Sequence, residues 1–86
     1  MKHATCNGWT NYQTWNVALW FDNDEGLYHA YREQRERRKF NRETAESFVR
    51  EIMPAGTPDL TKRSEHGRDA YRGVDWQEIS RSFNDK

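Results

Sequence analysis

The 86-residue sequence contains only one cysteine, Cys6, so an internal disulfide bond is excluded. Small secreted domains usually carry several disulfides, and the setting we expect is therefore reducing and cytoplasmic. No apolar run approaches the roughly 20 residues that a membrane-spanning helix needs, and the start of the chain lacks the apolar stretch of a signal peptide. We therefore expect no membrane role.

An excess of charge of either sign is also absent, because fourteen basic residues are matched by fourteen acidic ones. This balance argues against two classes of protein, the polyanionic mimic of DNA and the generally basic coat of a nucleic acid. Any electrostatic attraction to a partner must therefore come from a local patch.

Residues that could hold a metal ion or carry catalysis are few and scattered. Residues 22 to 24 begin like a calcium-binding loop, but the sixth position of that loop is Leu27 instead of glycine. No glycine-rich phosphate loop occurs, and no nucleophile has an identifiable base beside it. The cysteine and histidines do not follow the spacing of a metal site, and they are Cys6, His3, His29 and His66. The sequence predicts a non-enzymatic protein that has no cofactor and no metal.

Large aromatic side chains are what the sequence does contain: four Trp, four Tyr and four Phe in a chain that is 34% hydrophobic and 33% charged. Such rings bury roughly 150–250 Å² each, so a few of them can replace many aliphatic residues. We therefore expect a single domain, residues 1–86, with a small aromatic core and a stability on the order of 5 kcal/mol.

Hydrophobic periodicity predicts two helices in the first half of the chain. The first covers about residues 11 to 21, and we expect Thr10 to cap it in a capping box with Gln13. The second runs from Asp24 or Glu25 to Arg38, after a turn formed by residues 22 to 26.

The third helix has the strongest pattern, and it lies between a cap at Asn41 and a stop at Pro54. Its predicted inner face is Ala45, Phe48, Val49, Ile52 and Met53, which follow helical spacing throughout. No segment alternates with the period of two that a strand needs. The fold class predicted is all-α, a small single-domain bundle of three to four helices.

The rest of the chain is predicted to be less regular. Residues 54 to 73 are expected to be a loop with one short helical turn at Thr57, tied down by Tyr71. Residues 74 to 83 form a short C-terminal helix, in which Asp75 is the cap and Glu78 completes a reciprocal pair. Residues 1 to 9 are expected to be a flexible N-terminus, and residues 10 to 53 the helical core.

The segment of residues 11 to 21 holds four aromatic rings and no charge. A core role is the first interpretation, because this chain has little else to bury. Asn16 lies within the segment, and a buried amide needs partners, so we expect it to bond to loop backbone. A functional contact through this amide is the alternative.

Residues 32 to 42 carry six basic and two acidic side chains, a net charge of +4. Such a patch could neutralise phosphates or meet an acidic protein surface. The alternative is a solvated helix end, where cations lie favourably near the C-terminal carbonyls. No known nucleic-acid-binding motif accompanies the patch.

Residues 11 to 28 resemble a signature found in short, uncharacterised proteins of phages, prophages and other mobile elements. That signature reads close to N-Y-x-T-W-N-V-A-L-W-x-x-N-D-E-G-L-Y, and residues 74 to 79 also resemble the end of such proteins. The arginine-rich stretch and residues 55 to 73 are not part of the pattern. The resemblance implies a small protein of a mobile element, and such proteins commonly bind and block host machinery, including CRISPR complexes and restriction enzymes.

The leading hypothesis is an inhibitor of a host defence complex, of the anti-CRISPR or antirestriction type, that binds a host protein or protein–nucleic-acid complex in the host cytoplasm. The alternative is a nucleic-acid-binding accessory protein that uses the arginine-rich helix end. A homodimer is a further possibility, because so small a chain covers an apolar helix poorly and a second copy could bury the excess apolar surface. The expected contact residues are Arg35, Arg37, Arg38, Lys39 and Arg42 in the basic patch, Asp22, Asp24 and Glu25 on the acidic side, and Trp20 and Tyr28 as aromatic anchors.

Overall fold

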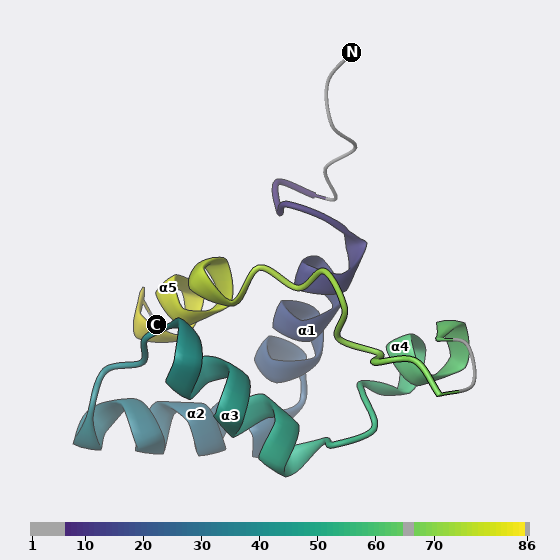
Figure 1. Ribbon diagram of the computed structural model, residues 1–86. Helices are drawn as coiled ribbons and strands as arrows, with labels where there is room; N and C mark the ends of the chain where they lie inside the picture. Colours follow the sequence, from purple (N-terminus) through teal and green to yellow (C-terminus); the bar gives the residue numbers. More distant parts are fainter. Residues whose placement is uncertain (1–6, 65–66, 86) are drawn as a thin grey trace.

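The computed structural model describes residues 7–64 and 67–85. The helices in these residues are α1 (Tyr12–Asn23), α2 (Glu25–Arg37), α3 (Arg42–Ile52), α4 (Pro58–Arg63) and α5 (Trp76–Asp85). Since no strand occurs in these two ranges, the all-α prediction is confirmed, with the short α4 as a fifth helix. Figure 1 shows α1, α2, α3 and α5 gathered together, whereas α4 and the α2–α3 connection lie at opposite ends of the molecule.

Asn11, and not Thr10, caps α1, so the helix begins one residue later than predicted. The Asn11 Oδ1 accepts hydrogen bonds from the Thr14 backbone N–H at 2.9 Å and from the Thr14 hydroxyl at 2.7 Å. Its Nδ2 donates to the Gly73 carbonyl at 2.7 Å. The predicted capping box of Thr10 with Gln13 is wrong, because the Asn11 side chain caps the helix with its oxygen and at the same time bonds to the distant Gly73 carbonyl with its nitrogen.

The start of α5 has the predicted cap but not the predicted reciprocal pair. The Asp75 Oδ1 accepts the Glu78 backbone N–H at 3.1 Å. The Asp75 N–H, however, donates to the Thr14 hydroxyl at 2.9 Å, and the Glu78 carboxylate accepts the Thr10 N–H at 3.0 Å. The prediction for Glu78 fails because these groups bond to the beginning of α1, which joins the first and last helices.

The junction of α1 and α2 is tighter than predicted, because a single residue makes it. Asp24 ends α1 by donating its N–H to the Trp20 carbonyl at 3.0 Å, and it caps α2 by accepting the Leu27 N–H at 3.0 Å. Asp22 therefore lies inside α1 and not in a turn, which corrects the predicted break at residues 22 to 26. The cap of α3 is as predicted, since Asn41 forms a capping box.

The centre of the core is an aromatic cluster around Phe83 of α5. The Phe83 ring stacks on Tyr31 at a centroid distance of 4.4 Å and lies 5.4 Å from the ring of Phe21. Phe40 and Phe48 close the cluster at 5.0 and 6.1 Å from the same ring. These five rings come from four helices and the α2–α3 connection. The Phe83 side chain of α5 therefore contacts α1, α2, α3 and the connection at once.

The apolar stripe of α3 is only partly covered. Ala45 and Val49 are fully buried, but Ile52 is 37% exposed, which corrects its assignment to the inner face. Among the described helices the backbone of α3 lies close only to that of α5, and its contact with α1 is made by the Phe48 ring on Phe21, so the stripe is not wholly covered. None of the described helices has the length and apolar character needed to span a bilayer.

Part of the sequence-based interpretation falls outside the described residues. The structure does not describe residues 1 to 6 of the expected flexible N-terminus, which include His3 and Cys6, and it does not describe His66. Within the same N-terminal segment Trp9 is described, and it packs against the hydrophobic core.

Candidate functional site

The polar side chains of α1 bond to α4. Asn16 is 1% exposed, its Nδ2 donates to the Asp59 carboxylate at 2.9 Å, and its Oδ1 accepts the Thr57 hydroxyl at 2.6 Å. The Trp20 indole N–H donates to the same Asp59 oxygen, Oδ2, at 2.9 Å. The partners of Asn16 are thus side chains of the first turn of α4 and its cap, and the expectation of loop backbone is wrong.

These bonds give the polar residues of the signature a role in the fold. Asn11 and Thr14 join α1 to the segment before α5, and Asn16 and Trp20 join it to α4. Buried amides and hydroxyls need such partners, because an unpaired one costs free energy. The uncharged segment of residues 11 to 21 is therefore core on one side and an attachment surface for other segments on another.

A hollow of about 200 Å³ lies beside the predicted anchor Trp20. We call it the Trp20 hollow, and its lining residues are Leu19, Trp20, Asn23 and Asp59. The hydrogen bond from Asn16, and then that from Trp20, lower the pKa of the Asp59 carboxyl, which keeps it ionised. Sequence reasoning missed Asp59, since it only predicted a helical turn there and nothing local shows that its side chain meets α1.

The cations at the α2–α3 connection are exposed, as their predicted role requires. We call this surface the cationic connection, and its residues are Arg37, Arg38, Lys39 and Arg42. Its backbone is held in place by Asn84 of α5, whose amide accepts the Phe40 N–H and donates to the Phe40 carbonyl, both at 2.9 Å. The cationic side chains therefore project from an anchored segment.

Arg35, the fifth predicted cation, lies differently from the other four. It is half-buried, and its Nη1 donates to the carbonyls of Phe83 at 3.1 Å and Asn84 at 3.4 Å. The last carbonyls of a helix have no partner within the helix, and a cation is favourable there. Arg35 thus stabilises the end of α5.

The three predicted acidic residues lie around the α1–α2 junction. Asp24 and Glu25 are exposed, whereas Asp22 is half-buried and accepts the hydroxyl of Tyr31 at 2.8 Å. Burial first, and this bond second, raise the pKa of the Tyr31 hydroxyl. The acidic group and the cationic connection are at opposite ends of the 13-residue α2, about 20 Å apart at roughly 1.5 Å per residue.

The second predicted anchor, Tyr28, is a half-buried residue of α2. Its hydroxyl accepts a hydrogen bond from Arg32 Nη1 at 2.7 Å, and the Arg32 guanidinium lies 5.3 Å from the ring centroid. The ring also contacts the buried Tyr31 edge-on at 5.5 Å. Tyr28 therefore sits between the core and the charged surface of α2.

A second group of cations, not predicted as a site, lines a hollow of about 560 Å³ at the other end of the molecule. Its arginines are Arg63, Arg68 and Arg72, from α4 and the loop before α5. The Arg63 guanidinium lies 4.2 Å from the centroid of the Tyr12 ring. The sequence places these arginines in an irregular segment, where spacing says nothing about proximity, and only the fold brings them together.

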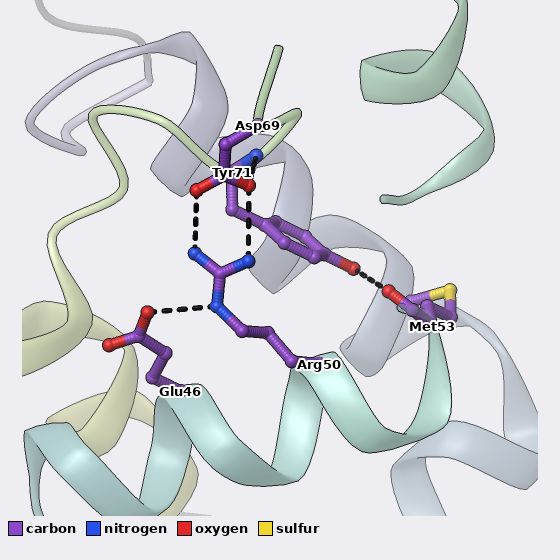
Figure 2. A network of polar contacts seen from close by, with 5 residues as sticks. All are labelled: Glu46, Arg50, Met53, Asp69 and Tyr71. Carbon is purple, nitrogen blue, oxygen red and sulfur yellow. Dashed lines mark hydrogen bonds and ion pairs between the residues drawn. The ribbon is translucent and has the colours of Figure 1, made fainter. Parts of the chain in front are cut away.

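The loop before α5 is fastened to α3 by Arg50 (Figure 2). Its guanidinium donates to both Asp69 oxygens, at 3.0 and 2.8 Å, and its Nε donates to Glu46 at 2.8 Å. The buried Tyr71 donates its hydroxyl to the Met53 carbonyl at 2.6 Å, which confirms that Tyr71 ties down the loop. Burial raises the pKa of Tyr71 to about 12.

The Asp69 carboxylate should make the stability of the protein sensitive to acid. The hydrogen bonds from Arg50 lower its pKa in the folded state, below an unfolded value of about 3.9. A lowered folded pKa stabilises the protein above about pH 4, and this contribution is lost as the pH falls through the folded pKa. The substitution Asp69→Asn should remove on the order of 0.5 kcal/mol of this dependence, since solvent weakens a half-exposed pair.

Urea unfolding midpoints of the wild type and Asp69→Asn between neutral pH and about pH 2 measure this effect. Glu51→Gln, which removes an exposed carboxylate of α3, is the control and should keep the acid dependence of the wild type. Parallel acid profiles for the wild type and Asp69→Asn would contradict the assignment.

No curated protein and no solved structure matches the chain. A family of unknown function (DUF7249) matches residues 2–85, a range that contains all five helices and the residues of both hollows. No group of three or more His, Cys, Asp or Glu residues suited to a metal ion lies within residues 7–64 and 67–85. The chain belongs to the family of unknown function DUF7249.

Proposed function

We propose that this chain is a small non-enzymatic protein that acts by binding another protein stoichiometrically. The observation that carries the proposal is the cationic connection, four exposed cations on a backbone segment that Asn84 anchors to α5. Anchoring reduces the conformational entropy that binding would otherwise cost. Clustered charge on a fixed segment steers a partner of opposite charge and sets its orientation.

The rest of the proposed surface follows α2 and the end of α1. Asp24 and Glu25 form its acidic end, so the surface has separated charges of both signs. Trp20 and Tyr28 are half-buried, and aromatic residues in such positions commonly provide most of the affinity of an interface. A partner would be recognised by its complementary charge pattern and by side chains that pack on these rings.

In its specific form the proposal names the partner as a host defence complex. The chain would then be an inhibitor of the anti-CRISPR or antirestriction type, encoded by a phage or another mobile element. The support is the resemblance of residues 11 to 28 to the signature of mobile-element proteins. This resemblance is an analogy that concerns the genomic setting of the protein more than its activity.

Removing the charge of the cationic connection should weaken partner binding at least tenfold. The variant Arg37→Ala/Arg38→Ala/Arg42→Ala tests this in a pulldown of the tagged protein from host lysate, with circular dichroism to confirm folding. A control variant, Arg81→Ala, removes an exposed cation of α5 that lines neither the Trp20 hollow nor the arginine-lined hollow, and it should bind like the wild type. Equal capture by all three proteins would contradict the proposed surface.

A nucleic-acid-binding accessory protein is the second candidate, and the arginine-lined hollow of Arg63, Arg68 and Arg72 is what favours it. A nuclease-treated arm of the same pulldown separates the two candidates. If the captured partners disappear after nuclease treatment, the result supports the nucleic-acid-binding function over the protein-binding one. Binding to phosphates should also weaken with salt, by a slope of about −0.9 per neutralised phosphate on logarithmic axes.

A further inference from the structure

The Asp59 carboxylate in the Trp20 hollow is oriented by neutral groups. Both hydrogen bonds to its side chain fall on Oδ2, from the Asn16 amide and the Trp20 indole. Among residues 7–64 and 67–85, no lysine or arginine forms an ion pair with Asp59, and no donor bonds to its Oδ1. Lys62, one turn along α4, adds only a Coulombic attraction. The carboxylate thus keeps its negative charge and one free oxygen in a fixed position.

The rest of the Trp20 hollow has the chemistry of a side-chain pocket. Leu19 and the Trp20 indole are apolar walls, and Asn23 adds a second polar group one helical turn from Leu19. Sites for drug-sized ligands measure roughly 300–1,000 Å³. The volume of about 200 Å³ is smaller, and suits a single long side chain better than a cofactor.

We propose that the Trp20 hollow binds an arginine side chain that the protein partner presents, an inference that rests on the proposed protein-binding function. The aliphatic stem of arginine matches Leu19, and its planar guanidinium can lie against the Trp20 indole while it donates to Asp59. Lysine matches the charge but not the planar stacking surface. The partner would therefore present arginine at this end of the interface and acidic groups at the cationic connection.

The inference also explains why two signature residues point to one oxygen. Asn16 and Trp20 together leave Asp59 little freedom to turn, which a binding carboxylate needs. Thr57 pairs only the Asn16 Oδ1, so Asp59 serves as acceptor for the buried Nδ2, and the Trp20 bond to the same Asp59 oxygen is the second restraint on the carboxylate.

The test is a titration of the ¹⁵N-labelled full chain with N-acetyl-arginine amide, followed through the indole N–H signal of Trp20 by NMR. Trp20→Phe assigns this signal among the four tryptophans. The uncharged isostere N-acetyl-citrulline amide is titrated in parallel. We expect a saturable shift of the Trp20 signal with the arginine compound, and binding of the citrulline compound at least tenfold weaker.

The variant Asp59→Asn keeps an oxygen for both donors and loses the charge, so it should fold and bind the arginine compound at least tenfold more weakly. Glu51→Gln removes an exposed carboxylate of α3, outside the proposed surface and both hollows, and should bind the arginine compound like the wild type. Equal shifts with arginine and citrulline in the wild type, or no shift with either, would overturn the inference without relying on any variant. Because no partner is present in this titration, its failure would leave the pulldown result standing, and a failed pulldown would leave the pocket standing.

Discussion

Replacing Phe83 by alanine is expected to leave the protein largely unfolded at room temperature. The Phe83 side chain is 1% exposed and contacts four other rings, those of Phe21, Tyr31, Phe40 and Phe48. Removing a buried phenylalanine costs about 3–5 kcal/mol, because apolar contacts are lost and a cavity remains. A domain of this size has a stability on the order of 5 kcal/mol, so little would be left.

Urea unfolding followed by circular dichroism measures this loss. Phe83→Leu keeps most of the volume and should cost clearly less than the alanine variant, since the core can repack around an aliphatic group. Phe48→Ala provides a second comparison, because Phe48 is only half-buried and its loss should be smaller. A cooperative unfolding curve for Phe83→Ala within about 1 kcal/mol of the wild type would show that the cluster is not the centre of the core.

Asn16→Ala should destabilise the protein by about 2–3 kcal/mol, a large effect for a single polar residue. The substitution leaves the hydroxyl of Thr57, which is fully buried, without its acceptor at 2.6 Å. A buried donor without a partner loses its hydration and gains nothing in return. The same change removes one of the two donors to Asp59 and leaves the Trp20 bond to it, so the indole signal of Trp20 should also change.

A double-mutant cycle separates the pair from the other roles of each residue. Thr57→Val removes the hydroxyl, which also caps α4 by accepting the Leu60 N–H at 3.1 Å. The cycle cancels this capping effect, and the coupling of Asn16→Ala with Thr57→Val should be at least about 1 kcal/mol. Additive effects of the two substitutions would contradict a direct bond between buried groups.

These contacts change the meaning of the uncharged aromatic segment. Its inward residues Val17, Ala18 and Phe21 belong to the core, as the composition suggested. Its polar residues attach α4 and the beginning of α5, and its outer residues Leu19 and Trp20 line a hollow. Trp20 takes part in both the fold and the proposed function, because its indole N–H bonds to Asp59 while its ring lines the hollow, so periodicity alone could not separate the two.

The sequence by itself determined the class of the fold and the ends of several helices. The cap at Asn41 and the end of α3 before Pro54 were predicted because such signals act between residues a few positions apart. The exposed cations of the α2–α3 connection were also predicted, since a dense run of charge stays in water wherever the helices pack.

Only the tertiary structure decided which polar groups pair across the chain. Thr10 and Glu78 are 68 positions apart, and Asn16 and Asp59 are 43 apart, so no local pattern contains these hydrogen bonds. A cap has several partners within reach of its side chain, and the partner chosen depends on which distant segment packs beside it. For the same reason no local pattern indicates the Asp59 carboxylate of the proposed arginine site, because it meets Trp20 only where α4 packs against α1.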